Sequence, residues 1–260
     1  MQKLTVEQTV SSGEPLAQIL SRLLEQSCLA YNNSRGKLKD YDCPLCLNRG
    51  DFEEIRGGEV VRVPCECQKI RRSMILLHAS GLADTVAKMT LNGFETPEEW
   101  QKERKRKAVQ FLRQESDSWF AILGGTGSGK THICTAICAE LLRRGKMVRY
   151  IEWTRFAQSL ERLYYKPEAF ADYYEPVRDV EVLYLDDFLK HSTNERVLGF
   201  AFDLIDHRGK AGLQTIISGE LELAEIAALD TALAGRLVEL CGEYLFQNGK
   251  DPARNWRVRK

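Results

Sequence analysis

Short apolar runs alternate with longer stretches of helical periodicity through residues 117–260. The short runs have the length and the β-branched and aromatic content of buried strands; they are residues 119–123, 147–151, 180–185 and 213–217. The periodic segments between them predict helices at residues 129–145, 153–165 and 194–208. Because strands that alternate with helices form parallel sheets covered on both faces, the pattern predicts a three-layer α/β domain.

The chain before residue 117 has a different pattern. Residues 14–29 predict an amphipathic helix, whose apolar positions are Leu16, Ile19, Leu20, Leu23, Leu24 and Cys28. This apolar face can pack on its own domain or receive a partner, and the sequence leaves both interpretations open. Residues 31–42 are polar and predict a linker, while residues 68–116 are helical and charged, with a break at 93–97.

Composition narrows the class of protein. The 260 residues contain 37 Lys plus Arg and 37 Asp plus Glu, so the net charge is zero and any contact with nucleic acid must come from a local patch. No apolar run approaches the roughly 18 residues of a membrane span, and the N-terminal residues lack the apolar segment of a signal peptide. We expect a cytoplasmic protein that has no membrane partner.

A glycine-rich loop follows the first predicted strand of the sheet and precedes a predicted helix. It matches the pattern G-x-x-x-x-G-K-[ST] through Gly124, Gly125, Thr126, Gly127, Ser128, Gly129, Lys130 and Thr131. Glycines let backbone N–H groups turn toward phosphate oxygens, and the helix N-terminus adds a positive dipole end. The motif predicts an ATP site in which Lys130 reaches the β- and γ-phosphates and the Thr131 hydroxyl binds Mg²⁺.

An acidic pair ends the third predicted strand, in the run Val182 to Asp187. Asp186 is expected to hold Mg²⁺ as the acid of a Walker B motif, with Asp187 placed to orient or deprotonate the attacking water. Taken alone, the same run is also typical of a strand that ends in a turn. The phosphate loop upstream favours the catalytic interpretation.

Hydrolysis also requires a γ-phosphate sensor and a positive charge for the transition state. Ser218, at the polar end of the fourth predicted strand, is the sensor candidate. Arg236 is the first candidate for an arginine finger and Arg208 the second. For either arginine, a surface salt bridge explains the sequence equally well.

Four cysteines form two close pairs, Cys43 with Cys46 and Cys65 with Cys67. Two strand-like runs around Gly57-Gly58 predict a hairpin, which returns the second pair to the end where the first pair lies. Four thiolates at one end of a hairpin predict a structural Zn²⁺ site, and a pair of disulfides or an iron–sulfur cluster are the alternatives. The remaining cysteines are expected to be buried core thiols: Cys28, Cys134, Cys138 and Cys241.

The ordered set of motifs resembles the DnaC/DnaI-type helicase loaders, in the variant that carries an N-terminal zinc module. The motifs are the cysteine hairpin, Gly93-Phe94, GGTGSGKT, VLYLDDF, TIISGE and AGRL. The resemblance implies a P-loop AAA+ ATPase core with a reduced lid, preceded by a small zinc-binding hairpin module with helices. It also implies three parts: residues 1–85 as the helicase-interaction module, 86–116 as a helical link, and 117–260 as the ATPase domain.

This resemblance implies an ATP-hydrolysing loader that binds a DnaB-type hexameric replicative helicase and helps to place it on single-stranded DNA. Loaders would self-associate through ATP, with Arg236 of one copy at the phosphates of the next. The leading alternative is an IstB-like transposase-helper ATPase acting on DNA, which shares the core but usually lacks the cysteine module. A zinc-stabilised adaptor that uses nucleotide only as a structural ligand is a third hypothesis.

Two segments are candidates for a DNA surface. Residues 153–179 interleave aromatic and basic side chains, a composition that suits stacking on single-stranded bases, although the aromatics can equally form core or a subunit interface. In the resembled loaders this segment corresponds to an insertion that faces DNA. The basic run at residues 102–107 is typical of a solvated helix, with phosphate contact as the alternative.

Overall fold

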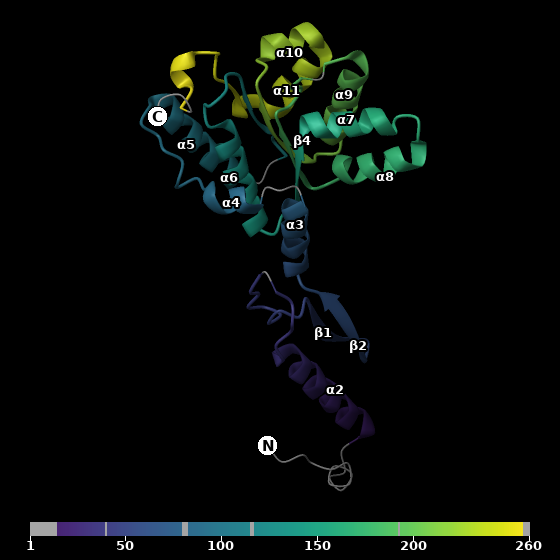
Figure 1. Cartoon of the computed structure of the whole chain (residues 1–260). Coiled ribbons are helices and arrows are strands. Elements are labelled where there is room, and N and C mark those ends of the chain that lie inside the picture. Colours follow the sequence, from purple (N-terminus) through teal and green to yellow (C-terminus); the bar gives the residue numbers. More distant parts are fainter. Residues whose placement is uncertain (1–14, 40, 80–82, 115–116, 192, 257–260) are drawn as a thin grey trace. The chain divides into compact units, whose positions relative to one another are not determined.

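The computed structural model describes residues 15–39, 41–79, 83–114, 117–191 and 193–256. The expectation that the N-terminus is no signal peptide, and the first residue of the predicted helix at 14–29, fall on 1–14, outside the described residues. Contacts divide the chain into two compact units, Met1–Arg71 and Arg72–Lys260 (Figure 1).

The first unit contains helix α2 (Leu16–Asn33) and a hairpin of β1 (Asp51–Arg56) and β2 (Glu59–Pro64). The strands pair antiparallel, from Asp51 opposite Pro64 to Arg56 opposite Glu59. The turn glycines between the strands have φ of 62° and 86°, the left-handed conformation that a tight two-residue hairpin requires. The predicted hairpin is therefore confirmed, and α2 runs four residues beyond the predicted helix, into the segment expected to be a linker.

The second unit is built on a five-stranded parallel sheet with the strand order β4-β5-β6-β3-β7. The strands are β3 (Phe120–Leu123), β4 (Val148–Glu152), β5 (Val182–Asp186), β6 (Gln214–Gly219) and β7 (Leu245–Gln247). The four predicted strands are confirmed to within two residues at each end. Strand β7 was not predicted, because three residues carry too little pattern to be recognised.

Helices cover both faces of this sheet (Figure 1). One layer contains α7 (Trp153–Leu163), α8 (Pro167–Arg178), α9 (Glu195–Lys210), α10 (Leu223–Leu229) and α11 (Thr231–Cys241). The opposite layer contains α4 (Ala83–Lys88), α5 (Glu99–Arg113) and α6 (Lys130–Arg143), together with Leu77 of α3 (Cys67–Ala79). Two short 3₁₀ turns, η2 (Gly242–Tyr244) and η3 (Pro252–Arg254), flank β7. The predicted three-layer α/β fold is confirmed.

The topology places the polar residues of three strands at one edge of the sheet. Strands β3, β5 and β6 are neighbours or next neighbours and run parallel, so their carboxyl ends open together. The phosphate loop follows β3, Asp186 ends β5 with Asp187 directly after it, and Glu220 follows β6. Among the helices that the structure describes, none is both long and apolar enough to cross a membrane.

Candidate functional site

The glycine-rich loop adopts backbone conformations that explain its composition. Gly124, Gly127 and Gly129 have φ of 104°, 71° and 80°, which other L-residues rarely adopt. A Cβ at Gly129 would lie 2.7 Å from the ring of Phe94. Helix α6 begins at Lys130, directly after the loop, so its unpaired N–H groups and positive dipole end face the same space.

The Lys130 side chain lies inside the phosphate loop. Its ammonium donates to the carbonyl oxygens of Gly124 and Gly125, each at 2.7 Å, and the residue is only 7% exposed. Burial lowers the pKa of Lys130, while Glu220 and Asp187 act in the opposite direction. The loop thus places a partly desolvated cation where phosphate oxygens would bind.

Asp186 accepts hydrogen bonds from four side-chain hydroxyls of the site. It accepts hydrogen bonds from the hydroxyls of Tyr150, Tyr184 and Thr131 at 3.1, 3.1 and 3.3 Å, and a close one from Ser218. Burial raises the pKa of both tyrosines, so their hydroxyls stay protonated and act as donors. Asp186 and Thr131, the predicted magnesium ligands, are therefore neighbours.

A pocket of about 380 Å³ lies over these groups. It is lined by Met89, Thr126, Gly127, Gly129, Lys130, Thr131, His132, Asp186, Asp187, Lys190 and Glu220. The residues fit a nucleoside triphosphate with Mg²⁺. Backbone N–H groups and Lys130 would bind the phosphates, and the oxygen atoms of Thr131 and Asp186 are the hard ligands that Mg²⁺ prefers. The metal would supply positive charge for phosphoryl transfer. Ser218 does not line this pocket but reaches it through Asp186.

A buried arginine from α5 supports the loop from behind. Arg104 donates to the carbonyl of Ser128 at 3.2 Å and to the side-chain oxygen of Asn248, and it is 3% exposed. Asn248 in turn donates to the Ser128 hydroxyl at 2.6 Å. Burial and the nearby Arg254 lower the pKa of Arg104 to about 10. The basic run at 102–107 therefore is not uniformly a solvated surface, since one of its members braces the phosphate loop.

Replacing Arg104 with methionine should destabilise the second unit by about 1–3 kcal/mol, because Ser128 and Asn248 lose a charged donor while part of the desolvation cost is removed. Urea unfolding measures the change. The matched control is Arg106→Met on the same helix, whose side chain is 73% exposed and makes a single surface ion pair. Equal urea midpoints of unfolding for the two variants would show that Arg104 does not stabilise the phosphate loop.

The two arginine-finger candidates lie in different environments. Arg208 is fully buried and donates to Thr215 and to the backbone carbonyls of Arg178, Val180 and Gln214. It holds the sheet to α9 and cannot reach a neighbouring copy, so the second candidate was wrong. Arg236 on α11 pairs with Asp206 at 2.6 Å and Glu239 at 2.9 Å, with its side chain 32% exposed.

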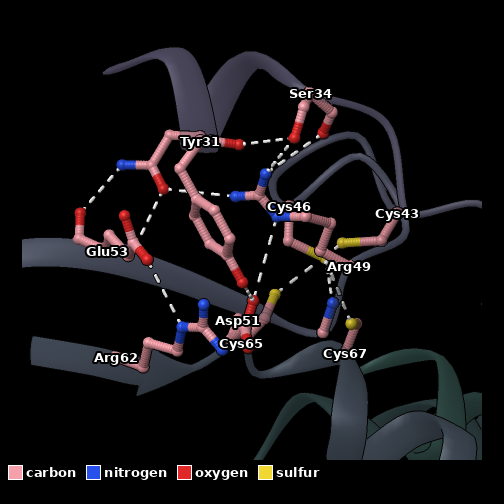
Figure 2. Close-up of polar contacts among 12 residues, drawn as sticks. Tyr31, Ser34, Cys43, Cys46, Arg49, Asp51, Glu53, Arg62, Cys65 and Cys67 are labelled. Carbon is pink, nitrogen blue, oxygen red and sulfur yellow. Dashed lines mark hydrogen bonds and ion pairs between the residues drawn. The ribbon is translucent and has the colours of Figure 1, made fainter. Parts of the chain in front are cut away.

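The four cysteines converge at one end of the hairpin, as Figure 2 shows. Their sulfur atoms all lie within 4.8 Å of one another, with Cys43 and Cys65 3.8 Å apart and Cys46 and Cys67 3.5 Å apart. A tetrahedron of sulfurs about 2.3 Å from a metal has edges of about 3.8 Å. The donor set and spacing therefore fit Zn²⁺, and the separations are those of unbridged sulfurs rather than disulfides.

Polar groups next to the cluster change the pKa values of its thiols. The Gly50 N–H donates to the sulfur of Cys46 at 3.2 Å. Burial raises the pKa of Cys46, but this N–H and the neighbouring thiols outweigh it and bring the pKa to about 7. Burial and the other thiols raise the pKa of Cys65 to about 12. Four buried thiols in contact cannot all ionise without a compensating metal.

A stacked arginine fastens α2 to the cysteine hairpin (Figure 2). The Arg49 guanidinium lies 3.6 Å from the ring centre of Tyr31, whose hydroxyl donates to Asp51 at 2.9 Å. Asn32 donates to the Glu53 carbonyl and accepts from the Glu53 N–H, each at 2.9 Å. The last turn of α2 therefore packs on β1 by polar contacts.

Comparison with known proteins assigns the family. The model of the IstB-like ATP binding proteins matches residues 67–243, about two thirds of the chain. The chain belongs to this IstB-like ATP-binding family. Its phosphate loop and acidic strand end both lie within the matched region.

Two relatives of this IstB-like protein come from Bacillus subtilis (strain 168). The phage-like element PBSX protein XkdC is 26% identical over 246 residues, which cover 88% of this chain and 91% of XkdC. YqaM, described as an uncharacterized protein, is 28% identical over 195 residues, or 70% of this chain. The matched part of this chain spans 61% of the length of YqaM.

Two solved structures share the fold of this chain. The DnaC helicase loader superposes with a TM-score of 0.55 at 18% identity, over 64% of this chain and 99% of that chain. The replication initiator DnaA bound to AMPPCP and single-stranded DNA gives 0.54 at 23% identity, over 63% and 50%. The predicted AAA+ P-loop core is confirmed, and so is the resemblance to DnaC/DnaI-type loaders at the level of the fold.

The predicted aromatic DNA surface is mostly core. Trp153, Phe156 and Tyr174 are buried against the sheet, because their helical spacing turns them inward. Tyr164 and Tyr165 remain 45% and 79% exposed at the turn between α7 and α8. The four cysteines expected to be core thiols are all buried: Cys28, Cys134, Cys138 and Cys241.

Several residues of the site escaped the sequence reasoning: Arg104, Tyr150, Lys190, Glu220 and Asn248. Arg104 had a signal, because Gln101, Arg104 and Ala108 follow the spacing of a buried helix face. Lys190 had a weak one, a lysine three residues after the second acid of the strand end. For Asn248 the sequence holds no signal, since its partner is 144 positions away.

Proposed function

We propose that this IstB-like protein is an ATP-hydrolysing loader that binds a DnaB-type hexameric replicative helicase and helps to place it on single-stranded DNA. The relation of its fold to the DnaC helicase loader and to DnaA supports the proposal. Such a role would place the protein in the cytoplasm. In this scheme residues 1–85 contact the helicase, 86–116 form the link, and 117–260 form the ATPase domain.

The pocket residues divide the work of hydrolysis among them. Lys130 and the loop N–H groups bind the phosphates, Thr131 and Asp186 hold Mg²⁺, and Asp187 orients the attacking water. Ser218 senses the site by its hydrogen bond to Asp186. Arg236 would leave Asp206 to reach the phosphates bound by the next copy when loaders associate.

The observation that carries the proposal is the first unit, Met1–Arg71, which contributes no described residue to the nucleotide pocket. This unit combines the cysteine cluster, to which we assign structural Zn²⁺, with a helix whose apolar face is open to solvent. Leu16, Leu20 and Leu23 of α2 lie on one side at helical spacing and are 73%, 52% and 52% exposed. An apolar stripe on a zinc-stabilised scaffold suits the capture of a protein partner.

Capture of the cognate helicase by the full chain tests the proposal. Leu20→Glu with Leu23→Glu should weaken capture at least about tenfold, because charge replaces the apolar stripe, while ATP binding and zinc content stay unchanged. Pull-down and sedimentation with and without ATP measure capture. The control is Gln18→Glu with Gln26→Glu, which adds the same charge at exposed glutamines of α2.

The outcomes separate the loader from the transposase helper. No complex between the unaltered chain and helicase, in either nucleotide state, would contradict the loader proposal. ATP-dependent filaments on duplex DNA would instead favour the helper. Normal helicase loading by a chain unable to bind ATP would favour an adaptor.

Single-stranded DNA is assigned to a smaller surface than the sequence suggested. The Arg196 guanidinium lies 4.3 Å from the ring centre of Tyr164 and 5.7 Å from that of Tyr165. Arg162 and Lys166, which flank these two tyrosines in the sequence, are exposed. Two exposed rings among three cations provide stacking and phosphate contacts for unpaired bases.

A further inference from the structure

A strained turn follows the acidic strand end and projects a lysine into the nucleotide pocket. Asp187 and Leu189 have φ of 52° and 60°, values that cost non-glycine residues energy and persist only where packing enforces them. Phe188 and Leu189 are each 1% exposed, and the Phe188 N–H donates to the Ser218 carbonyl at 2.9 Å. The turn is thereby fixed to β6, and Lys190 is left facing the pocket.

Lys190 joins two acids from different strands. Its ammonium lies 3.1 Å from the carboxylate of Asp187 and 2.8 Å from that of Glu220. Asp187 follows β5 and Glu220 follows β6, so the lysine bridges the proposed water-orienting acid and the end of the sensor strand. The hydrogen bond to Glu220 raises the pKa of Lys190, which keeps the ammonium charged.

The charges around the pocket are unbalanced. Among the described lining residues, the lysines are Lys130 and Lys190, whereas the acids are Asp186, Asp187 and Glu220. A nucleoside triphosphate brings further negative charge next to the acids, and its third phosphate carries the largest share of any single phosphate. Lys190 carries the pocket's other ammonium on a flexible four-carbon stem, so it can exchange a carboxylate for a phosphate oxygen.

We propose that Lys190 is a γ-phosphate sensor that exchanges its ion pairs with Asp187 and Glu220 for the third phosphate of a bound nucleoside triphosphate. This inference rests on the proposed ATP function of the same pocket. Before nucleotide binds, the ion pair with Lys190 neutralises the Asp187 carboxylate, so Asp187 does not orient water. When the triphosphate binds, Asp187 is released to orient water, so the catalytic acid becomes available only with a γ-phosphate in place.

Nucleotide affinity provides a test that does not depend on turnover. Lys190→Met should weaken binding of AMPPCP by about 10- to 100-fold, the usual value of a hydrogen bond to a charged group, and change ADP binding less than about threefold. Calorimetry on the full chain measures both constants. Lys146→Met is the matched control, because Lys146 forms a comparable exposed ion pair with Glu181 away from the pocket.

A double variant separates phosphate contact from simple charge balance. Lys190→Met with Glu220→Gln leaves the same net charge as the original Asp187–Lys190–Glu220 group. If Lys190 contacts the third phosphate, the double variant still binds AMPPCP as weakly as Lys190→Met. If the lysine only balances Glu220, the double variant recovers the original preference for triphosphate, and the sensor proposal is wrong.

The same titrations distinguish this inference from the function on which it rests. An unaltered chain that binds neither AMPPCP nor ADP would overturn the proposed ATP function itself. An unaltered chain that binds both, with Lys190→Met keeping the original ratio of the two affinities, would overturn the sensor alone. The Lys190 side chain is 26% exposed, and circular dichroism checks that its replacement leaves the fold intact.

Discussion

Lys130→Ala is expected to abolish ATP-dependent activity, lowering the hydrolysis rate on the order of a thousandfold and ATP affinity at least about tenfold. The ammonium is buried within the phosphate loop, 2.7 Å from two of its carbonyl oxygens. An alanine leaves those carbonyls and any bound phosphate without this cation. A phosphate-release assay and calorimetry with AMPPCP measure the two effects.

Arg143→Ala is the matched control for this prediction. Arg143 lies at the far end of the same helix, α6, and its side chain is 60% exposed in a surface ion pair with Glu140. It should leave hydrolysis and affinity unchanged. Full ATP affinity in Lys130→Ala, with the fold intact by circular dichroism, would contradict the assignment of the pocket.

Replacing Cys43 and Cys46 with serine should remove zinc from the full chain and abolish helicase capture. Structural zinc typically contributes about 10–16 kcal/mol of apparent binding free energy, which also holds the fold of its module. The first unit places no large apolar core around the sulfurs; Tyr41 and Phe52 are the partly buried hydrophobic residues that pack on the cluster in the described chain. Without metal, we expect this unit to unfold.

Metal content by atomic emission and the helicase pull-down measure the two losses. Cys28→Ala is the control, because Cys28 is buried on α2 but is not a member of the cluster. ATP affinity should stay unchanged in both variants, since every residue lining the pocket belongs to the second unit. A serine variant that retains both zinc and capture would show that the cluster is no structural zinc site.

Lys130 and the four candidate zinc ligands were predictable because each motif is recognised from residue types at short, fixed spacings along the chain. The phosphate loop needs eight consecutive residues between a strand and a helix, and both flanking elements have strong periodicity. The cysteine pairs needed only a hairpin, and Gly57-Gly58 supplied its turn. Strand assignments succeeded for the same reason, because β3 and β5 are uninterrupted apolar runs.

Helix faces were harder to read when their polar residues are buried. Arg104 and Arg208 looked like surface cations, yet both are 3% exposed or less. Each is compensated by backbone carbonyls and neutral side chains rather than by an acid, a solution that the position of charged residues along the chain does not reveal. The aromatic residues of α7 left two interpretations open, since a stacking surface and a core share one composition, and only the structure shows that most of them are core.

The sequence by itself determined the elements and the chemistry that resides in short segments: the parallel strands, the phosphate loop, the acidic strand end and the cysteine hairpin. Tertiary structure alone decided which side chains complete these motifs. Arg104 meets Asn248 across 144 positions, and Lys190 meets Glu220 across 30. Periodicity and propensity report interactions within a few residues, whereas these contacts depend on sheet order and on which helix covers which face. That ordering brings Lys190 between two acids and Arg104 behind the loop.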